Sequence, residues 1–127
     1  MSIEDFNRDI DDFGRGIDRD QVAFQKKIVL EALRRLAFRT PVDTGRARGN
    51  WQVTIKMPAQ GTLPLCDKTG DEVVARGVAA ISLLPPGQVV WISNNVEYIE
   101  FLEEGSSRQA PHGMLRVTVE ELRSLFR

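Results

Sequence analysis

The sequence of 127 residues holds only one cysteine, Cys66, and one histidine, His112. A single cysteine excludes an intramolecular disulfide bond and argues against a cysteine-based structural zinc site. Metal sites in proteins usually gather several histidine, cysteine and carboxylate side chains, and the sequence shows no such cluster. We therefore expect the protein to work without a metal ion or another cofactor.

Long apolar runs are missing as well. No run approaches the roughly 20 apolar residues that a membrane-spanning helix requires. The start of the chain, Met1–Asp5, is acidic and does not have the basic and then apolar layout of a signal peptide. We therefore expect no membrane partner, and a protein that is intracellular where it is made.

Residues that could catalyse a reaction are few. Catalysis needs a nucleophile, a base and an orienting group in one place, and Cys66 and His112 form the only possible Cys–His pair. His112 stands between a proline and a glycine, as is typical of a loop residue. Asp43, Thr44 and Gly45 could belong to a phosphate or metal loop, but no glycine-rich fingerprint surrounds them, which favours a turn. We expect a protein that is not an enzyme.

A large excess of charge of one sign is also absent, since the formal net charge is −1. The charge is nevertheless unevenly distributed: residues 1–20 carry net −4, residues 21–56 net +6 and residues 57–127 net −3. Such segregation suits self-assembly, in which a basic face of one copy meets an acidic face of the next. Unrelated solvated faces would give the same pattern, so both interpretations stay open. The near-neutral balance argues weakly against a nucleic-acid-binding domain.

Arginine is concentrated between positions 34 and 48. Five arginines lie there, opposed only by Asp43: Arg34, Arg35, Arg39, Arg46 and Arg48. They could contact nucleic-acid phosphates, or they could form bidentate pairs with carboxylates of a neighbouring subunit. The candidate carboxylates are Glu97, Glu100, Glu103 and Glu104. Aromatic residues for base stacking stand mainly at the edges of the arginine segment, which favours subunit contact and leaves nucleic-acid binding as the alternative.

Hydrophobic periodicity and breaker residues predict the secondary structure. Helices are expected over residues 3–13, 20–38, 70–83, 96–104 and 113–125, and strands over residues 51–57 and 88–93. Gly14 and Gly16 should end the first helix, and Thr40-Pro41 should end the second. The last segment also alternates like a strand, but its longer pattern favours a helix. The sum is an α+β domain over residues 20–127, with a small antiparallel sheet packed against a long N-terminal helix and additional short helices, preceded by an arm over residues 1–19.

Single positions carry further expectations. Asp20 is a candidate N-cap of the long helix, and Thr69 with Glu72 resembles a capping box for the helix over 70–83. Inward-facing side chains are expected at Val74, Val78 and Ile81 in that helix, and at Tyr98, Phe101 and Leu102 in the next one. The four glutamates between 97 and 104 should then face solvent, and Gly105 should cap the C-terminus of their helix.

Two segments together resemble a known family. The first is Thr40-Pro41-Val42-Asp43-Thr44-Gly45-Arg46-Ala47-Arg48-Gly49-Asn50-Trp51, and the second is Asn95-Val96-Glu97-Tyr98-Ile99-Glu100-Phe101-Leu102-Glu103-Glu104-Gly105-Ser106-Ser107. They are similar to the segments Pro-Val-Asp-Thr-Gly-x-Leu/Ala-Arg and Asn-x-x-Tyr-Ala-x-x-Leu-Glu-Phe-Gly-Thr-Ser of the neck and tail-completion family of tailed bacteriophages. A long basic helix precedes the first segment in that family, as it does here, and the likeness extends over most of residues 20–127.

The resemblance implies a structural virion protein at the head–tail junction of a long-tailed phage, assembled in the cytoplasm of the host bacterium. It implies a ring, with six-fold symmetry expected, that joins the connector and head-closure proteins to the tail tube or tail terminator, with genomic DNA passing through the lumen. In such a ring the five arginines would pair with the four glutamates of the next copy. The residues to which it assigns a structural role are Asp43, Thr44, Gly45, Trp51, Tyr98, Phe101 and Gly105.

The chain departs from the family after the second segment. Family members often continue there with Pro-Phe-Leu and a basic residue, whereas this chain has Pro111-His112-Gly113. The resemblance therefore does not choose among a neck protein, a tail-completion protein and a tail terminator.

Overall fold

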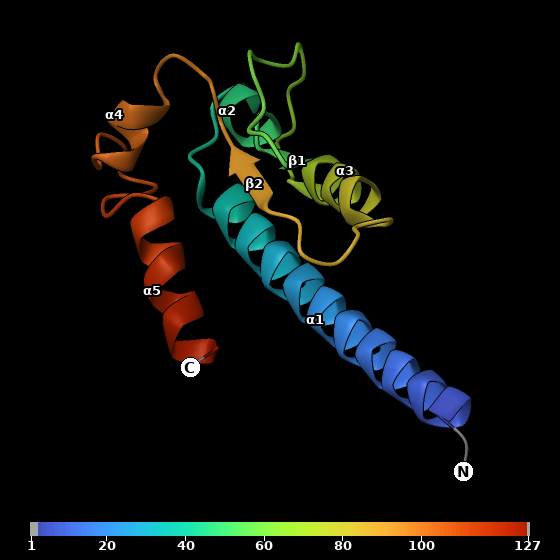
Figure 1. Ribbon diagram of the computed structural model, residues 1–127. Coiled ribbons are helices and arrows are strands. Elements are labelled where there is room, and N and C mark those ends of the chain that lie inside the picture. The colour runs from blue at the N-terminus through green and yellow to red at the C-terminus, as the bar shows by residue number, and fades with distance from the viewer. Residues whose placement is uncertain (1–2, 127) are drawn as a thin grey trace.

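The structure, a computed structural model, describes residues 3–126, except for the side chains of residues 6, 13, 14, 17 and 18. This part of the chain folds into helices around a two-stranded sheet (Figure 1). In chain order the elements are α1 (Ile3–Arg39), α2 (Arg46–Gly49), β1 (Gln52–Ile55), α3 (Asp71–Ile81), β2 (Val90–Ser93), α4 (Ile99–Glu103) and α5 (Leu115–Leu125). The α+β class and the long N-terminal helix that the sequence predicts are confirmed.

Helix α1 is one uninterrupted helix of 37 residues, so the predicted break at Gly14 and Gly16 is wrong. A glycine weakens a helix by about 1 kcal/mol, but it ends a helix only where its backbone turns to the left-handed region. An ion pair between Asp12 and Arg15, with an N–O distance of 2.8 Å, spans Gly14. Such a pair, three residues apart, adds a small stabilisation that helps the helix continue.

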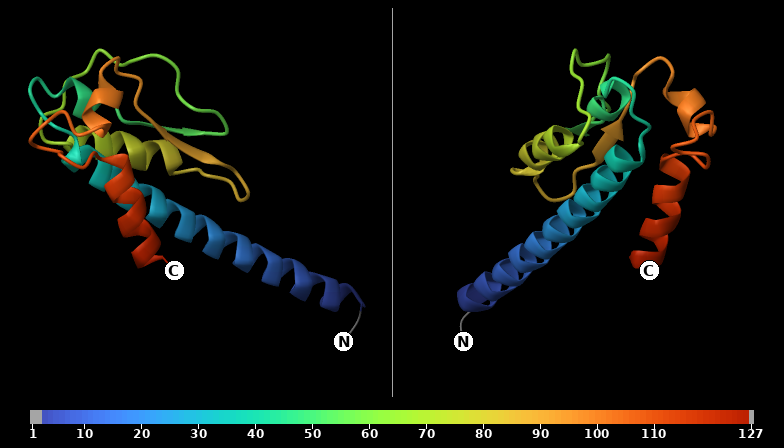
Figure 2. Two further views of the ribbon diagram at one scale, coloured as in Figure 1. Left: turned by 90° about the vertical axis from the view of Figure 1, so that its left-hand side faces the viewer. Right: turned by 180° about the vertical axis from the view of Figure 1, so that it is seen from behind.

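The continuity of α1 changes the expected organisation of the N-terminal region. Asp20, predicted as an N-cap, lies in the middle of the helix, and the boundary between residues 1–19 and 20–127 also falls inside it. The helix ends at Arg39, two residues before Pro41, as predicted. Its N-terminal half projects away from the rest of the molecule, which Figures 1 and 2 show from three sides.

Strands β1 and β2 are antiparallel, with Val53 opposite Ile92 and Ile55 opposite Val90. These four side chains are half-buried and pack against the core residues of α1 and α3. Trp91 is on the other face of the sheet and is exposed. The second strand, expected to be apolar throughout, therefore buries only one of its faces.

Helix α3 covers the sheet and crosses α1 at a close contact. A Cβ atom on Gly77 would lie 2.1 Å from the Cδ2 atom of Leu33, so a larger residue here would force the buried Leu33 side chain to move. The buried face of α3 consists of Val73, Gly77 and Ile81. Val78, predicted to face inward, is exposed, because the glycine and not the neighbouring valine turns toward α1.

Helix α5 lies against the C-terminal half of α1 and runs in the opposite direction (Figure 1). Arg35 and Arg39 of α1 both form ion pairs with Glu121 of α5. At the other end of the contact the rings of Phe24 and Phe126 meet edge to face, with centroids 5.5 Å apart. The helical interpretation of the last segment is thus confirmed.

Candidate subunit interface

Buried hydrogen bonds join the first residue of the first family-like segment, Thr40, to its last residue, Trp51. The hydroxyl of Thr40 donates to the carbonyl of Leu36 at 2.6 Å and accepts a hydrogen bond from the indole Nε1 of Trp51 at 2.7 Å. Thr40 is fully buried, and Trp51 is 7% exposed and belongs to the main core cluster. The last turn of α1 is thereby tied to the start of β1.

The turn at Gly45 depends on glycine. Its φ is 89°, and its carbonyl accepts a hydrogen bond from the amide of Asp67 at 2.9 Å. A Cβ atom at this position would lie 2.8 Å from the carbonyl carbon of Asp67. Asp43 and Thr44 are exposed, and the Thr44 hydroxyl accepts from the amide of Arg46 at 3.2 Å. This geometry is a hydrogen-bonded turn, as the sequence favoured.

Asp67 caps helix α3. Its side chain accepts hydrogen bonds from the amides of Val73, Gly70 and Thr69 at 3.0, 2.9 and 3.2 Å. Burial by itself would raise the pKa of the Asp67 carboxyl, but these donors together outweigh it and lower the pKa below its ordinary value. The predicted capping box of Thr69 and Glu72 is wrong, because Gly70 takes the N-cap position with a φ of 86°.

The two family-like segments meet within one chain. The guanidinium of Arg46 donates to both carboxylate oxygens of Glu97 at 2.8 and 3.0 Å and lies 5.8 Å from the ring centroid of Tyr98. The side-chain amide of Asn94, the residue before the second segment, donates to the carbonyl of Ala47 at 2.8 Å. The paired charges raise the pKa of Arg46 and lower that of Glu97. A contact that the sequence placed between subunits is thus satisfied without a second copy.

Two more of the predicted interface arginines have partners inside the chain. Arg35 donates to Glu121 at 2.7 Å, and Arg39 donates to the other oxygen of the same carboxylate. Sequence reasoning missed Glu121, because nothing in the local pattern shows that α5 lies beside α1. Arg34, by contrast, is exposed on α1.

Arg48 binds the carbonyl groups at the end of α1. Its guanidinium donates to the carbonyls of Phe38 and Thr40 at 3.1 and 3.0 Å and to that of Lys68 at 2.6 Å. The carbonyls of Phe38 and Thr40 are free to accept because no further helical turn uses them. Burial lowers the pKa of Arg48 from its ordinary value, against a smaller opposing effect of Asp67. Arg48 therefore has a structural role at the C-terminus of α1.

Glu103 does not face solvent, contrary to the prediction. Its carboxylate accepts hydrogen bonds from the amides of Met114 and Leu115 at 2.8 Å and from that of Arg116 at 3.0 Å. Burial would raise its pKa, but the three amides and the nearby Arg116 guanidinium lower the pKa below its ordinary value. Glu103 thus supplies the carboxylate at the N-terminus of α5, where the helix dipole favours negative charge.

Helix α4 ends at Glu103, and Gly105 makes the left-handed turn that terminates it. The amides of Gly105 and Ser106 donate to the carbonyls of Leu102 and Phe101 at 3.1 and 3.2 Å, and Gly105 has a φ of 92°. These are the two hydrogen bonds of a Schellman motif, which needs a left-handed residue at this position. The turn fixes the direction in which the chain leaves α4.

The outer face of α4 is part apolar and part acidic. Phe101, predicted to face inward, is 63% exposed, because Val96, Ile99 and Leu102 supply the contacts with the core. Tyr98, the other predicted anchor, is half-buried. Glu100 and Glu104 are exposed, as predicted, and flank Phe101 in sequence by one and three residues. We call Glu100, Phe101 and Glu104 the α4 knob.

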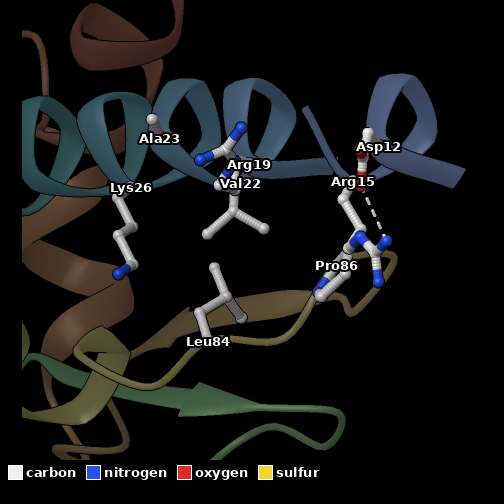
Figure 3. A pocket seen from close by; sticks show the side chains of 8 residues that line it. All are labelled: Asp12, Arg15, Arg19, Val22, Ala23, Lys26, Leu84 and Pro86. Carbon is white, nitrogen blue, oxygen red and sulfur yellow. Dashed lines mark hydrogen bonds and ion pairs between the residues drawn. The ribbon is translucent and has the colours of Figure 1, made fainter. Parts of the chain in front are cut away.

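A groove with a volume of about 770 Å³ lies between α1 and the loop that joins α3 to β2 (Figure 3). We call it the α1 groove, and it is lined by Asp12, Arg15, Arg19, Val22, Ala23, Lys26, Leu84 and Pro86. Sequence reasoning missed it, because splitting α1 at Gly14 assigned Arg15 and Arg19 to an acidic arm. The spacing of three and four residues from position 12 to position 26 was the available signal.

No family model, no curated protein and no solved structure matches this chain. Among the residues that the structure describes, no group of three or more histidine, cysteine and carboxylate side chains could hold a metal ion. Within the same residues, the helices are too short or too polar to cross a membrane.

Proposed function

We propose that this chain is a non-enzymatic structural protein of the head–tail junction of a long-tailed bacteriophage. Copies of it form a ring between the connector and the tail tube. The observation that supports the proposal is the contact between the two family-like segments through Arg46 and Glu97. The segments on which the resemblance rests thus form one structural unit at one end of the molecule.

The roles of the groups with shifted pKa agree with this proposal. Asp67 and Glu103 cap helices α3 and α5, and Arg46 and Glu97 pair with each other. In an active site, the groups whose pKa is shifted face the cavity that binds the substrate. Here each such group is hydrogen-bonded to the protein itself, which is a structural use of charge.

The geometry gives less support to the alternative, a nucleic-acid-binding accessory protein. Such a protein would direct the guanidinium groups of the arginine segment toward phosphates. Arg35 and Arg39 instead bind Glu121, Arg46 binds Glu97, and Arg48 binds backbone carbonyls. Most of the donors that phosphate would need are therefore occupied within the chain.

The proposal is tested by locating the protein in purified phage particles. Mass spectrometry should detect it in virions, and antibody-bound gold should label the head–tail junction in electron micrographs. Disruption of its gene should leave DNA-filled heads and free tails, and the intact gene supplied on a plasmid should restore infectious particles. Absence of the protein from virions, or label on the capsid alone, contradicts the proposal. Salt-dependent DNA binding by the purified protein would then support the alternative.

A further inference from the structure

The α1 groove has an apolar floor and a basic rim. Val22 and Leu84 face each other from the two walls in Figure 3, and Val22 packs against the core cluster to which the buried Leu84 belongs. The exposed Pro86 extends this apolar surface beneath Arg15. The lining holds three basic side chains and one acid, so its net charge is +2. The acid, Asp12, is paired with Arg15. Such a surface suits an apolar side chain that is flanked by carboxylates.

The region around the groove is exposed in the part of the chain that the structure describes. Leu83, the residue before Leu84, is 91% exposed. On α1 the groove extends from Asp12, in the projecting N-terminal half, to Lys26, beside the loop that joins α3 to β2. Lys26 donates to the carbonyl of Ser82 at 3.0 Å, and this bond holds the loop beside the helix. The groove is therefore held in place, and the residues that the structure describes leave it open.

The α4 knob has the complementary chemistry. Phe101 is exposed to 63%, and Glu100 and Glu104 on either side of it are exposed as well. Glu103 and the turn at Gly105 hold the knob, because one caps α5 and the other ends α4. Aromatic side chains, Phe among them, are enriched in the core of protein interfaces, and polar residues form the rim around that core.

We infer that the α4 knob of one copy docks in the α1 groove of the next copy. Phe101 packs over the apolar surface that Val22 and Pro86 present in the groove, while Glu100 and Glu104 meet Arg15, Arg19 and Lys26. Helix α4 lies near the C-terminal end of α1 (Figure 1), whereas the groove is lined by residues 12–26 of that helix, so one copy does not fill its own groove. Each copy uses two different surfaces, and such a heterologous contact builds a ring when its rotation closes. The inference rests on the proposed ring and names the surfaces that join its subunits.

The test uses the purified full-length chain and measures its mass by sedimentation velocity over a range of concentrations. The wild-type chain should form oligomers. Phe101→Asp, which alters only the knob, and Arg19→Glu, which alters only the groove, should each weaken association at least tenfold. Both side chains are exposed, so circular dichroism should stay unchanged, as should the thermal midpoint at a concentration at which the wild type is monomeric. Glu72→Lys and Arg34→Glu, at exposed positions outside both surfaces, are the matched controls and should assemble like the wild type.

Mixing the two variants gives the decisive result. The Phe101→Asp chain keeps its groove and the Arg19→Glu chain keeps its knob, so together they should form a one-to-one dimer and nothing larger. A monomeric wild type overturns the inference, as does full assembly of either single variant. Loss of assembly in Arg34→Glu but not in Arg19→Glu also overturns it, because the arginine segment would then form the interface. Localisation in virions is independent of these results, so the failure of this inference and the failure of the proposed function are distinguishable.

Discussion

The indole nitrogen of Trp51 lies 2.7 Å from the hydroxyl oxygen of Thr40, and both residues are buried where α1 meets β1. The same hydroxyl donates to the carbonyl of Leu36, so one oxygen atom connects the end of a helix to the start of a strand. A buried indole N–H without an acceptor costs free energy, which makes this oxygen important for stability.

Thr40→Val should lower the free energy of unfolding by about 2–3 kcal/mol, because valine keeps the shape of threonine but leaves the Trp51 indole without an acceptor. Urea denaturation followed by fluorescence measures this change. Thr62→Val, at an exposed position, is the control and should change stability by less than about 0.5 kcal/mol. Equal effects of the two substitutions would show that the hydrogen bond contributes little.

Gly105→Ala should be more destabilising than Gly61→Ala, although both glycines have positive φ values of 92° and 74°. At Gly61 a Cβ atom would meet nothing within 4 Å, so only the backbone cost of about 1 kcal/mol applies. At Gly105 it would lie 2.3 Å from the carbonyl oxygen of Pro111, and the loop would have to move. Thermal unfolding of both variants compares the two costs, and equal midpoints would contradict the steric argument.

Asp67→Asn should make the protein less stable at neutral pH by about 2 kcal/mol and should reduce the loss of stability in acid. The pKa of Asp67 is lower in the folded chain than in the unfolded chain. The charged form therefore stabilises the fold above the unfolded pKa, and this contribution disappears as the pH falls through the folded pKa. Urea titrations between pH 7 and about pH 2 measure both effects. Asp43→Asn, at an exposed carboxylate, is the control, and an unchanged acid profile in Asp67→Asn would refute the assignment.

The ion pair between Arg46 and Glu97 should behave as an interaction within one chain. The double-mutant cycle of Arg46→Ala and Glu97→Ala should give a small coupling free energy, because Glu97 is exposed, with 70% of its side chain accessible. The coupling should fall in about 1 M salt and should not depend on protein concentration. A coupling that appears only at concentrations at which copies associate would place the pair between subunits.

Local patterns in the sequence predicted where helices and strands lie better than they predicted which helices and strands contact one another. The alternation before Met57 and the periodicity after Gly113 gave a strand and a helix, since both signals lie within one element. The face of α3 was misjudged, because the close approach of Gly77 to Leu33 depends on another helix. The role of Glu103 was missed for the same reason: the amides that it binds belong to α5.

The candidate interface shows the same difference. The acidic side, Glu100 and Glu104, could be read from exposed positions on a short helix. The basic side was sought where arginines are dense, but density along the chain does not show which guanidinium groups already have partners. Arg15 and Arg19 line the groove because α1 continues through Gly14, which no propensity argument favours.

Because α1 is unbroken, it also fixes the direction in which the side chains of its outer half point relative to the sheet. Each residue of a helix advances about 1.5 Å and turns by about 100°, so the direction of Arg19 relative to the sheet is set by the number of residues between them. One alanine inserted after Asp20 would swing everything before it about 100° away from Leu84, while a seven-residue insertion would nearly restore the facing about 10 Å farther out. The number of residues in the outer half of α1 therefore sets both how far its side chains lie from the sheet and which way they face. Its length can change without loss of alignment only in steps of about two turns.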